Sequence, residues 1–103
     1  MARLFVVLRT HGADWDEAMR LEDQPEWSAH AAFMDALHGQ GFTVLVGPLE
    51  GAPHALLVLR ADSAEQIEAR LAADPWTVNG LLRTTLIAPW TLRLGSLDSD
   101  QRR

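Results

Sequence analysis

Apolar residues along the chain fall in four short runs bounded by turn residues, and in two further segments they recur every three to four residues. The short runs predict β-strands, and the longer period predicts α-helices. The strands are expected over residues 3–10, 42–46, 54–61 and 81–94, and the helices over residues 25–39 and 64–73. The first and third strands are apolar on both faces, which is typical of central strands. Pro89 interrupts the last strand and suits an edge strand or a bulge.

These elements follow the order βαββαβ, which predicts a ferredoxin-like α+β fold, a four-stranded antiparallel sheet with two helices on one face. We expect the first and third strands to form the central pair and to run parallel to each other. Two helices cover only one face of such a sheet, and apolar side chains left in water on the other face cost about 25 cal/mol per Å². A second copy of the chain, packed sheet on sheet, is the simplest cover, so the pattern predicts a homodimer.

The helix over residues 25–39 carries the most informative position of the sequence. Pro25 is suited to its first turn and Gly39 to its end. One stripe of this helix contains, in order, Trp27, His30, Ala31, Met34 and Leu37. His30 therefore lies on the apolar face. A histidine facing the core either pairs with a nearby group, such as Glu26 one turn earlier, or belongs to a site.

The segment 14–22 offers Asp14 as a helix N-cap with a glutamate three residues later, which predicts a short surface helix. Its apolar side chains, Trp15, Ala18 and Met19, would then either pack over a cleft as a lid or cover part of the core as an ordinary loop helix. The sequence leaves both interpretations open.

The composition is that of an ordinary globular protein. The chain has 103 residues, 48% of them hydrophobic and 22% charged, which fits one domain, expected over residues 1–95, followed by a polar tail over residues 96–103. A net charge of −5 without any Lys/Arg run argues against nucleic acid and anionic membranes as partners. The apolar run near the start is too short for a signal sequence or a membrane span, so we expect a cytoplasmic protein.

The residue types present limit the chemistry. The chain has no Cys, no Lys and no Tyr, which excludes thiol, Schiff-base and phenol catalysis and leaves imidazole and carboxylate groups. His30 and His38 are roughly 12 Å apart along the helix, and no two histidines have the helical spacing of metal ligands, so we predict no metal site. The sequence has no Gly-rich phosphate loop, so we also predict no nucleotide cofactor.

Four further residues are candidates for contacts with a small-molecule substrate. Arg9 and His11 continue the alternation of the first strand, so they could line one end of a cleft, although strand-end residues more often lie exposed to solvent. Trp76 and Trp90 could wall an apolar pocket near Asp74, because ligand sites are often lined by aromatic rings around a few polar groups. Packing in the core or in a dimer explains the two tryptophans equally well.

Several motifs resemble the YCII-related (YciI-like) family over nearly the whole chain up to Leu94. The resemblance rests on the segments 30–37, 41, 47–49, 63–65, 74–76 and 87–90, which read HAAFMDAL, G, GPL, SAE, DPW and IAPW. It implies the dimeric α+β barrel fold, with His30 and Asp74 as an acid/base pair. One position departs from the family. Relatives often carry an arginine one turn before the histidine, where this chain has Trp27, so anion recognition at that point does not follow from the resemblance.

A carboxylate that holds one imidazole nitrogen fixes the tautomer and leaves the other nitrogen free to move a proton. We therefore expect Asp74 to hydrogen-bond His30, directly or through one water, at the edge of a pocket. The first functional hypothesis is a small-molecule enzyme, a lyase, isomerase or dehydrohalogenase-like catalyst, in which His30 acts as base and Asp74 orients it. A non-catalytic ligand-binding module and an accessory dimerisation module are the alternatives, in which Asp74 is only a helix cap.

Overall fold

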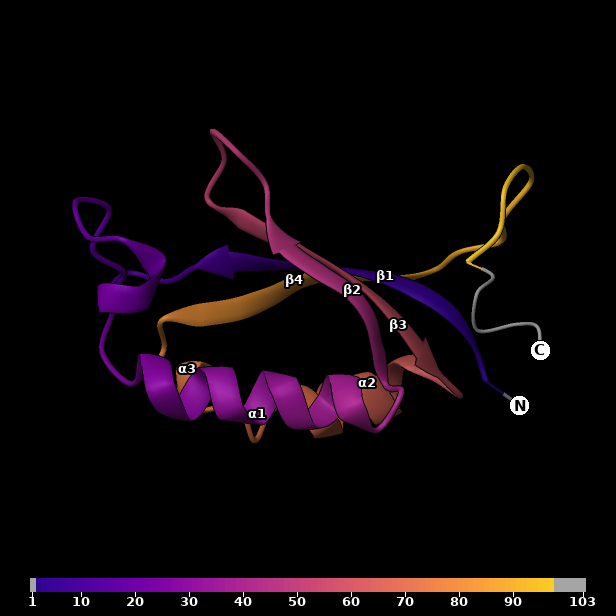
Figure 1. The fold of residues 1–103 in the computed structure, drawn as a ribbon, viewed down its shortest axis with the longest axis horizontal. Helices are drawn as coiled ribbons and strands as arrows, with labels where there is room; N and C mark the ends of the chain where they lie inside the picture. The colour runs from indigo at the N-terminus through magenta and orange to yellow at the C-terminus, as the bar shows by residue number, and fades with distance from the viewer. Residues whose placement is uncertain (1, 98–103) are drawn as a thin grey trace.

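Four strands and two main helices form a two-layer α+β structure (Figure 1). The computed structural model describes residues 2–97, so the predicted tail lies, from residue 98 on, outside the described residues. The strands are β1 (Arg3–His11), β2 (Thr43–Pro48), β3 (His54–Ala61) and β4 (Leu82–Pro89). The helices are the 3₁₀ helix η1 (Leu21–Asp23), α1 (Trp27–Gly39), α2 (Ala64–Leu71) and the short α3 (Pro75–Val78). None of the helices in this described part is long and apolar enough to cross a membrane.

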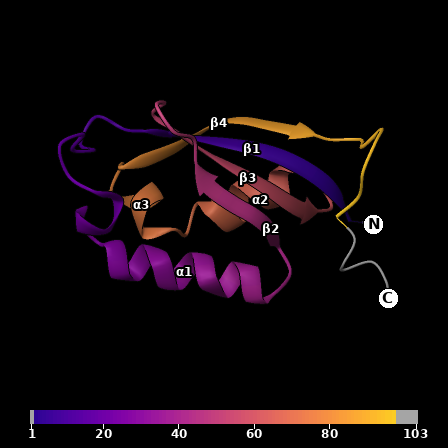
Figure 2. The same ribbon diagram turned by 45° about the horizontal axis from the view of Figure 1, so that its top comes forward.

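The strands form one sheet in the order β2-β3-β1-β4, in which every neighbouring pair is antiparallel. Both α1 and α2 lie on the same side of this sheet (Figure 2). The ferredoxin-like fold and the central position of β1 and β3 are therefore confirmed. The expectation that these two strands are parallel is wrong. The α1 crossover brings β2 into the direction of β1, and the β2–β3 hairpin then reverses the chain, which leaves β3 antiparallel to β1.

The core lies between the sheet and the helices. Alternate side chains of β1 and β3 meet in register, with Val7 opposite Leu57 and Phe5 opposite Leu59. These four side chains are buried in one cluster with Ile67 of α2. Complete burial of a side chain of this size stabilises the fold by about 1.5–3 kcal/mol. The cluster fixes the two helices against the sheet and so positions the residues described below.

Within residues 2–97, no helix covers the opposite face of the sheet (Figures 1 and 2). Alternation along β1 directs Leu4, Val6 and Leu8 toward this face, and all three are half-buried. On the flanking strands, Leu45 is 55% exposed and Leu86 is 43% exposed. The face is therefore apolar and only partly shielded from solvent.

The ends of α1 differ from the prediction. The helix begins at Trp27 rather than at Pro25, because Glu26 adopts a left-handed backbone conformation with a φ of 64°. Gly39 stays helical, and the left-handed turn that follows the helix falls on Gly41, whose φ is 79°.

The second helix starts as predicted and ends early. The side chain of Ser63 caps α2 by accepting the backbone N–H of Gln66 at 3.1 Å. The helix stops at Leu71, two residues before the predicted end at Ala73. The last strand is also shorter than predicted and ends at Pro89.

The surface helix predicted over residues 14–22 is wrong, because this segment forms turns that lead into η1. The buried side chain of Gln24 gives the physical reason. Its amide N–H donates to the backbone carbonyls of Asp16 at 2.7 Å and Met19 at 3.3 Å, and its Oε1 accepts the N–H of Asp16 at 3.2 Å. A side chain thus satisfies backbone groups that a helix would pair internally.

Candidate functional site

Asp74 is fully buried, and its carboxylate accepts hydrogen bonds from three groups. Oδ1 accepts from Nδ1 of His30 at 2.8 Å and from the backbone N–H of Trp76 at 3.1 Å. Oδ2 accepts from Nη1 of Arg9 at 2.8 Å and lies 3.0 Å from Nδ1 of His30. The predicted hydrogen bond between His30 and Asp74 is therefore present and direct.

Three separate elements bring these groups together. Arg9 lies near the end of β1 on the helix-covered face, where the alternation of the strand also places Phe5 and Val7. His30 lies near the start of α1 on the stripe turned toward the core. Asp74 is the N-cap of α3, a role that suits an aspartate before a proline. The site thus depends on how the start of α1 and the start of α3 pack over the end of β1.

Trp76 holds the imidazole of His30 in place. The two rings are stacked, with centroids 3.8 Å apart and planes 9° from parallel. Trp76 is fully buried, and its Nε1–H donates to the backbone carbonyl of Pro25 at 2.6 Å. Trp27 and Trp15 contact Trp76 at centroid distances of 5.8 and 5.2 Å. Trp76 therefore packs beside His30 as a fully buried part of an aromatic cluster, not as an exposed pocket wall.

The guanidinium group of Arg9 is buried and contacts other side chains of the protein, so it is not exposed at the end of a cleft as expected. It is only 1% exposed, and besides Asp74 its guanidinium donates from Nη2 to the hydroxyl of Thr77, which donates in turn to the carbonyl of Leu71. Its Nε is buried without a hydrogen-bond partner among the described residues. Burial lowers the pKa of Arg9, and the hydrogen bond and negative charge of Asp74 offset part of that effect. The guanidinium stays charged. Its role is to neutralise Asp74, which the sequence did not predict.

The charge state of Asp74 follows from its partners. Burial alone would raise the pKa of this carboxyl group. The hydrogen bond and the charge of His30 lower the pKa, as do the backbone N–H of Trp76 and the hydrogen bond from Arg9. Together these partners outweigh the effect of burial and hold the pKa of Asp74 below its ordinary value. Asp74 is therefore ionised at neutral pH and only accepts hydrogen bonds. Nδ1 of His30 must then carry a proton, which leaves a lone pair on Nε2 in the neutral ring.

His11 and Trp90 are not brought to Asp74. The ring of His11 stacks on Trp15 with a centroid distance of 3.9 Å, and its Nδ1 lies 3.1 Å from a carboxylate oxygen of Glu17. Trp90 follows β4, is 41% exposed, and its backbone N–H donates to the carbonyl of Leu4. Leu4 and Arg9 are at opposite ends of β1, five residues or roughly 17 Å apart. The expectation that Trp90 shares a pocket wall with Trp76 is therefore wrong within one chain.

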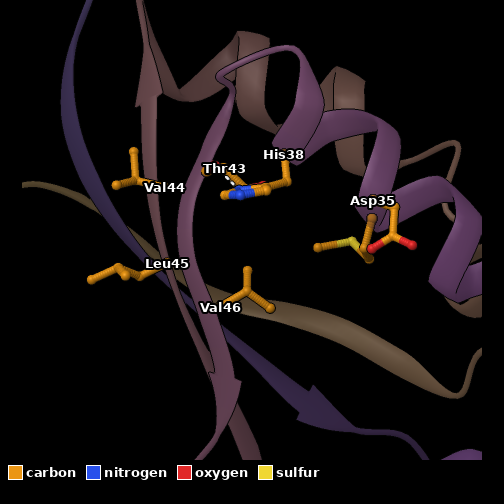
Figure 3. A pocket seen from close by; sticks show the side chains of 7 residues that line it. Asp35, His38, Thr43, Val44, Leu45 and Val46 are labelled. Carbon is orange, nitrogen blue, oxygen red and sulfur yellow. Dashed lines mark hydrogen bonds between the residues drawn. The ribbon is translucent and has the colours of Figure 1, made fainter. Parts of the chain in front are cut away.

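Among the cavities of the described residues, two on the helix-covered side of the sheet are well defined, and neither is lined by His30 or Asp74. One, of about 600 Å³, lies between α2, α3 and the start of β4 and includes Thr77 in its lining. The other, of about 340 Å³, lies between α1 and β2 (Figure 3). The side chain of His30 is 12% exposed to solvent. The pocket edge expected beside the His30–Asp74 pair is not formed by either cavity.

The described residues contain no group of three or more histidine and carboxylate side chains placed to hold a metal ion. The groups that converge at Asp74 are one carboxylate, one imidazole and one guanidinium, and the guanidinium cannot ligate a cation. What this arrangement can do chemically is accept a proton on Nε2 of His30 while Asp74 stabilises the resulting imidazolium.

The fold is shared with a solved structure of a named enzyme. This is the 5-chloro-2-hydroxyhydroquinone dehydrochlorinase (TftG) from Burkholderia phenoliruptrix AC1100, in complex with 2,5-dihydroxybenzoquinone. The two structures superpose with a TM-score of 0.66 at 22% sequence identity, over 85% of this chain and 93% of that chain. The likeness establishes the fold. No protein-family model matches the chain. No curated protein matches it either.

Proposed function

We propose that this protein is a YciI-like small-molecule enzyme, a lyase, isomerase or dehydrohalogenase-like catalyst, with His30 as its general base. The observation that supports the proposal most directly is the 2.8 Å hydrogen bond from Nδ1 of His30 to the buried carboxylate of Asp74. Asp74 keeps the neutral imidazole in the tautomer with a lone pair on Nε2, and its charge stabilises the imidazolium that forms when Nε2 takes a proton. A positioned base of this kind contributes about 10²–10⁴-fold to a rate.

A dehydrohalogenation illustrates the step. In a chlorinated hydroquinone that has tautomerised to its ketone form, the carbon that bears the chlorine is tetrahedral. Nε2 of His30 takes the proton of the ring hydroxyl group conjugated with that carbon, the electrons of the O–H bond form a carbonyl group and shift the ring double bond toward that carbon, and chloride leaves with the electrons of its own bond. In an isomerisation, the imidazolium returns the proton to a different atom of the substrate. The fold neighbour is named as a dehydrochlorinase, which supports elimination as the first reaction to test.

The surroundings of His30 favour a flat substrate of low charge. Trp76 and Trp27 flank the imidazole, at ring-centroid distances of 3.8 and 6.0 Å. The nearby cation, Arg9, is already neutralised by Asp74, so it offers little attraction to an anionic substrate. Trp76 is buried and positions the imidazole, whereas the half-buried ring of Trp27 offers an aromatic surface beside the proton-transferring group, which suits a planar ring such as a hydroxylated or halogenated hydroquinone.

Turnover and halide release with a panel of chlorinated hydroquinones test the proposal. The variant His30→Gln should lower kcat by about 10²-fold or more, because it removes the base, while its melting temperature stays close to that of the wild type. His38→Gln is the matched control, because it changes a second histidine of the same helix away from Asp74. If His30→Gln instead lowers stability by about 1–3 kcal/mol with no separate effect on activity, His30 is a core residue. Binding of the panel without turnover would support a non-catalytic ligand-binding module.

We further propose that the protein is a homodimer of the dimeric α+β barrel type and acts in the cytoplasm. The apolar sheet face supports this proposal, since Leu45 and Leu86 on it are about half exposed in the single chain. Light scattering at micromolar concentration should give twice the chain mass of 11.4 kDa. Leu86→Asp should shift the protein toward monomers, because it places a charge on the face that a second copy would bury. A monomeric wild-type protein would contradict the proposal.

A further inference from the structure

The cavity between α1 and β2 is separate from the His30–Asp74 pair, at the other end of α1. It is lined by Met34, Asp35, His38, Thr43 and the β2 residues Val44, Leu45 and Val46. Its volume of about 340 Å³ suits a small organic molecule. In Figure 3, His38 extends from α1 toward β2, and Val46 lies on the side of β2 that faces the helix.

The two functional side chains of this cavity both present hydrogen-bond acceptors. Nδ1 of His38 donates to the backbone carbonyl of Thr43 at 2.9 Å, so the neutral ring carries its lone pair on Nε2. Asp35 lies three residues before His38 on α1, and its carboxylate makes no hydrogen bond or ion pair with the residues that the structure describes. No arginine lines the cavity, and the chain contains no lysine. Asp35 and His38 are both exposed, so the cavity is an open groove with an unpaired carboxylate at its rim.

The rest of the lining is apolar and open to solvent. Val46 is 51% exposed and lies on an edge strand of the sheet. Met34 contributes a polarizable thioether, which adapts to ligands of different shape. An apolar surface of this kind beside an uncompensated carboxylate is complementary to a molecule with a positive end and an apolar body.

We propose that this cavity is a second ligand site, which binds a small organic cation, an ammonium group with a short apolar or aromatic body. The ammonium group pairs with the carboxylate of Asp35, and the apolar body packs on Met34, Val46 and the imidazole ring of His38. Its position near the C-terminal end of α1 also favours a positive charge, because the helix dipole is negative there. The proposal goes beyond the acid/base function of His30 and does not depend on it.

Three probes of the same shape and different charge test the proposal with the full chain. Benzylammonium, benzyl alcohol and benzoate are titrated into ¹⁵N-labelled protein at neutral pH, and the backbone amide signals of residues 34–46 are followed. Benzylammonium should shift these signals with saturation, and benzyl alcohol should bind about tenfold more weakly or worse, because it lacks the charge-assisted hydrogen bonds. Benzoate should not bind, since Asp35 repels it.

Two variants locate the contacts. Asp35→Asn should weaken benzylammonium binding about tenfold, because it removes the charge and keeps the size of the side chain. Glu50→Gln removes one charge from the exposed turn between β2 and β3 and should leave the affinity unchanged. His38→Asn keeps a donor for the carbonyl of Thr43 and removes the imidazole ring on which the apolar body packs, so it should weaken binding severalfold.

The proposal is overturned by equal binding of the charged and neutral probes, which would mean an unspecific apolar surface. Equal weakening by Asp35→Asn and Glu50→Gln would also overturn it, because only the overall charge would then matter. Shifts that do not saturate up to millimolar probe, or that appear outside residues 34–46, have the same consequence. None of these outcomes bears on catalysis by His30, which is read from turnover.

Discussion

Replacing Arg9 with Met removes the buried cation beside Asp74 and keeps an unbranched apolar side chain in its place. Two hydrogen bonds are lost, from Nη1 to Asp74 at 2.8 Å and from Nη2 to the hydroxyl of Thr77. Asp74 stays buried and keeps its hydrogen bonds from His30 and from the backbone of Trp76. The variant therefore tests how much the folded protein depends on a permanent positive charge at this carboxylate.

The expected loss combines two opposing effects. Breaking a buried ion pair by removing one partner costs about 3–5 kcal/mol. The variant also removes Nε of Arg9, which is buried without a hydrogen-bond partner, and an unsatisfied donor of this kind costs about 1–3 kcal/mol in the wild type. We therefore expect Arg9→Met to lower the free energy of unfolding at pH 7 by about 2 kcal/mol.

The effect should also depend on pH. The pKa of Asp74 is lowered in the folded protein, and Arg9 is one of the causes. A lowered pKa means that the ionised carboxylate contributes stability above its unfolded-state pKa, which is about 3.9, and that this contribution is lost as the pH falls through the folded-state pKa. In Arg9→Met the folded-state pKa of Asp74 rises toward the unfolded-state value or above it. Asp74 should therefore contribute less acid destabilisation in the variant than in the wild type, and the stability difference between the two proteins should shrink as the pH falls below about 4.

Urea unfolding at pH 7 and in steps into the acid range measures both effects. Arg20→Met is the matched control, since Arg20 pairs with Asp23 at the surface with a side chain that is 76% exposed, and we expect little change from it. Equal losses for Arg9→Met and Arg20→Met, or pH curves for Arg9→Met and wild type that run parallel, would refute the reasoning. Arg9→Met combined with Asp74→Leu should cost less than the sum of the two single changes, because the pair is removed together.

Two further predictions concern the backbone and the absence of a metal. Gly12→Ala should lower stability by about 3 kcal/mol or more, because a Cβ at this position would lie 1.9 Å from the backbone carbonyl oxygen of Gly80. Gly39→Ala is the control and should not destabilise the protein, because no atom lies within 4 Å of the added Cβ. Equal melting temperatures of the two variants would contradict the prediction. Elemental analysis of protein prepared without added metal should find no stoichiometric zinc or iron, and a stoichiometric metal would contradict the acid/base proposal as stated.

The secondary structure could be predicted because the period of apolar positions is a local property of the sequence. β3 matches its predicted range of residues 54–61 at both ends. The direction of a strand is not a local property. It depends on which strands are joined by the α1 crossover and which by the β2–β3 hairpin. The turns of residues 14–22 were missed because Gln24, which lies outside that segment, supplies the hydrogen bonds that shape it.

The site was only partly predictable for a related reason. His30 could be placed on the inner stripe of its helix from spacing alone, and its partner Asp74 came from the resemblance to a family. The ion pair between Arg9 and Asp74 joins residues that are 65 positions apart, so no local pattern contains it. The available signal was a charged residue at an inward position of a central strand, which requires a buried partner. Trp90 was misplaced because the pairing of β4 with β1 sets which end of the sheet it occupies.

Asp74 serves the fold and the site through the same carboxylate. Its Oδ1 caps α3 by accepting the N–H of Trp76, and the same atom accepts the hydrogen bond of His30. Any replacement of Asp74 therefore disturbs the start of α3, the charge balance of Arg9 and the orientation of the imidazole at once. The side chain of His30 makes its hydrogen bond to Asp74 and its ring contacts to Trp76 and Trp27, and it caps no helix. Loss of turnover in a folded His30 variant can therefore be assigned to proton transfer, whereas the same loss in an Asp74 variant cannot.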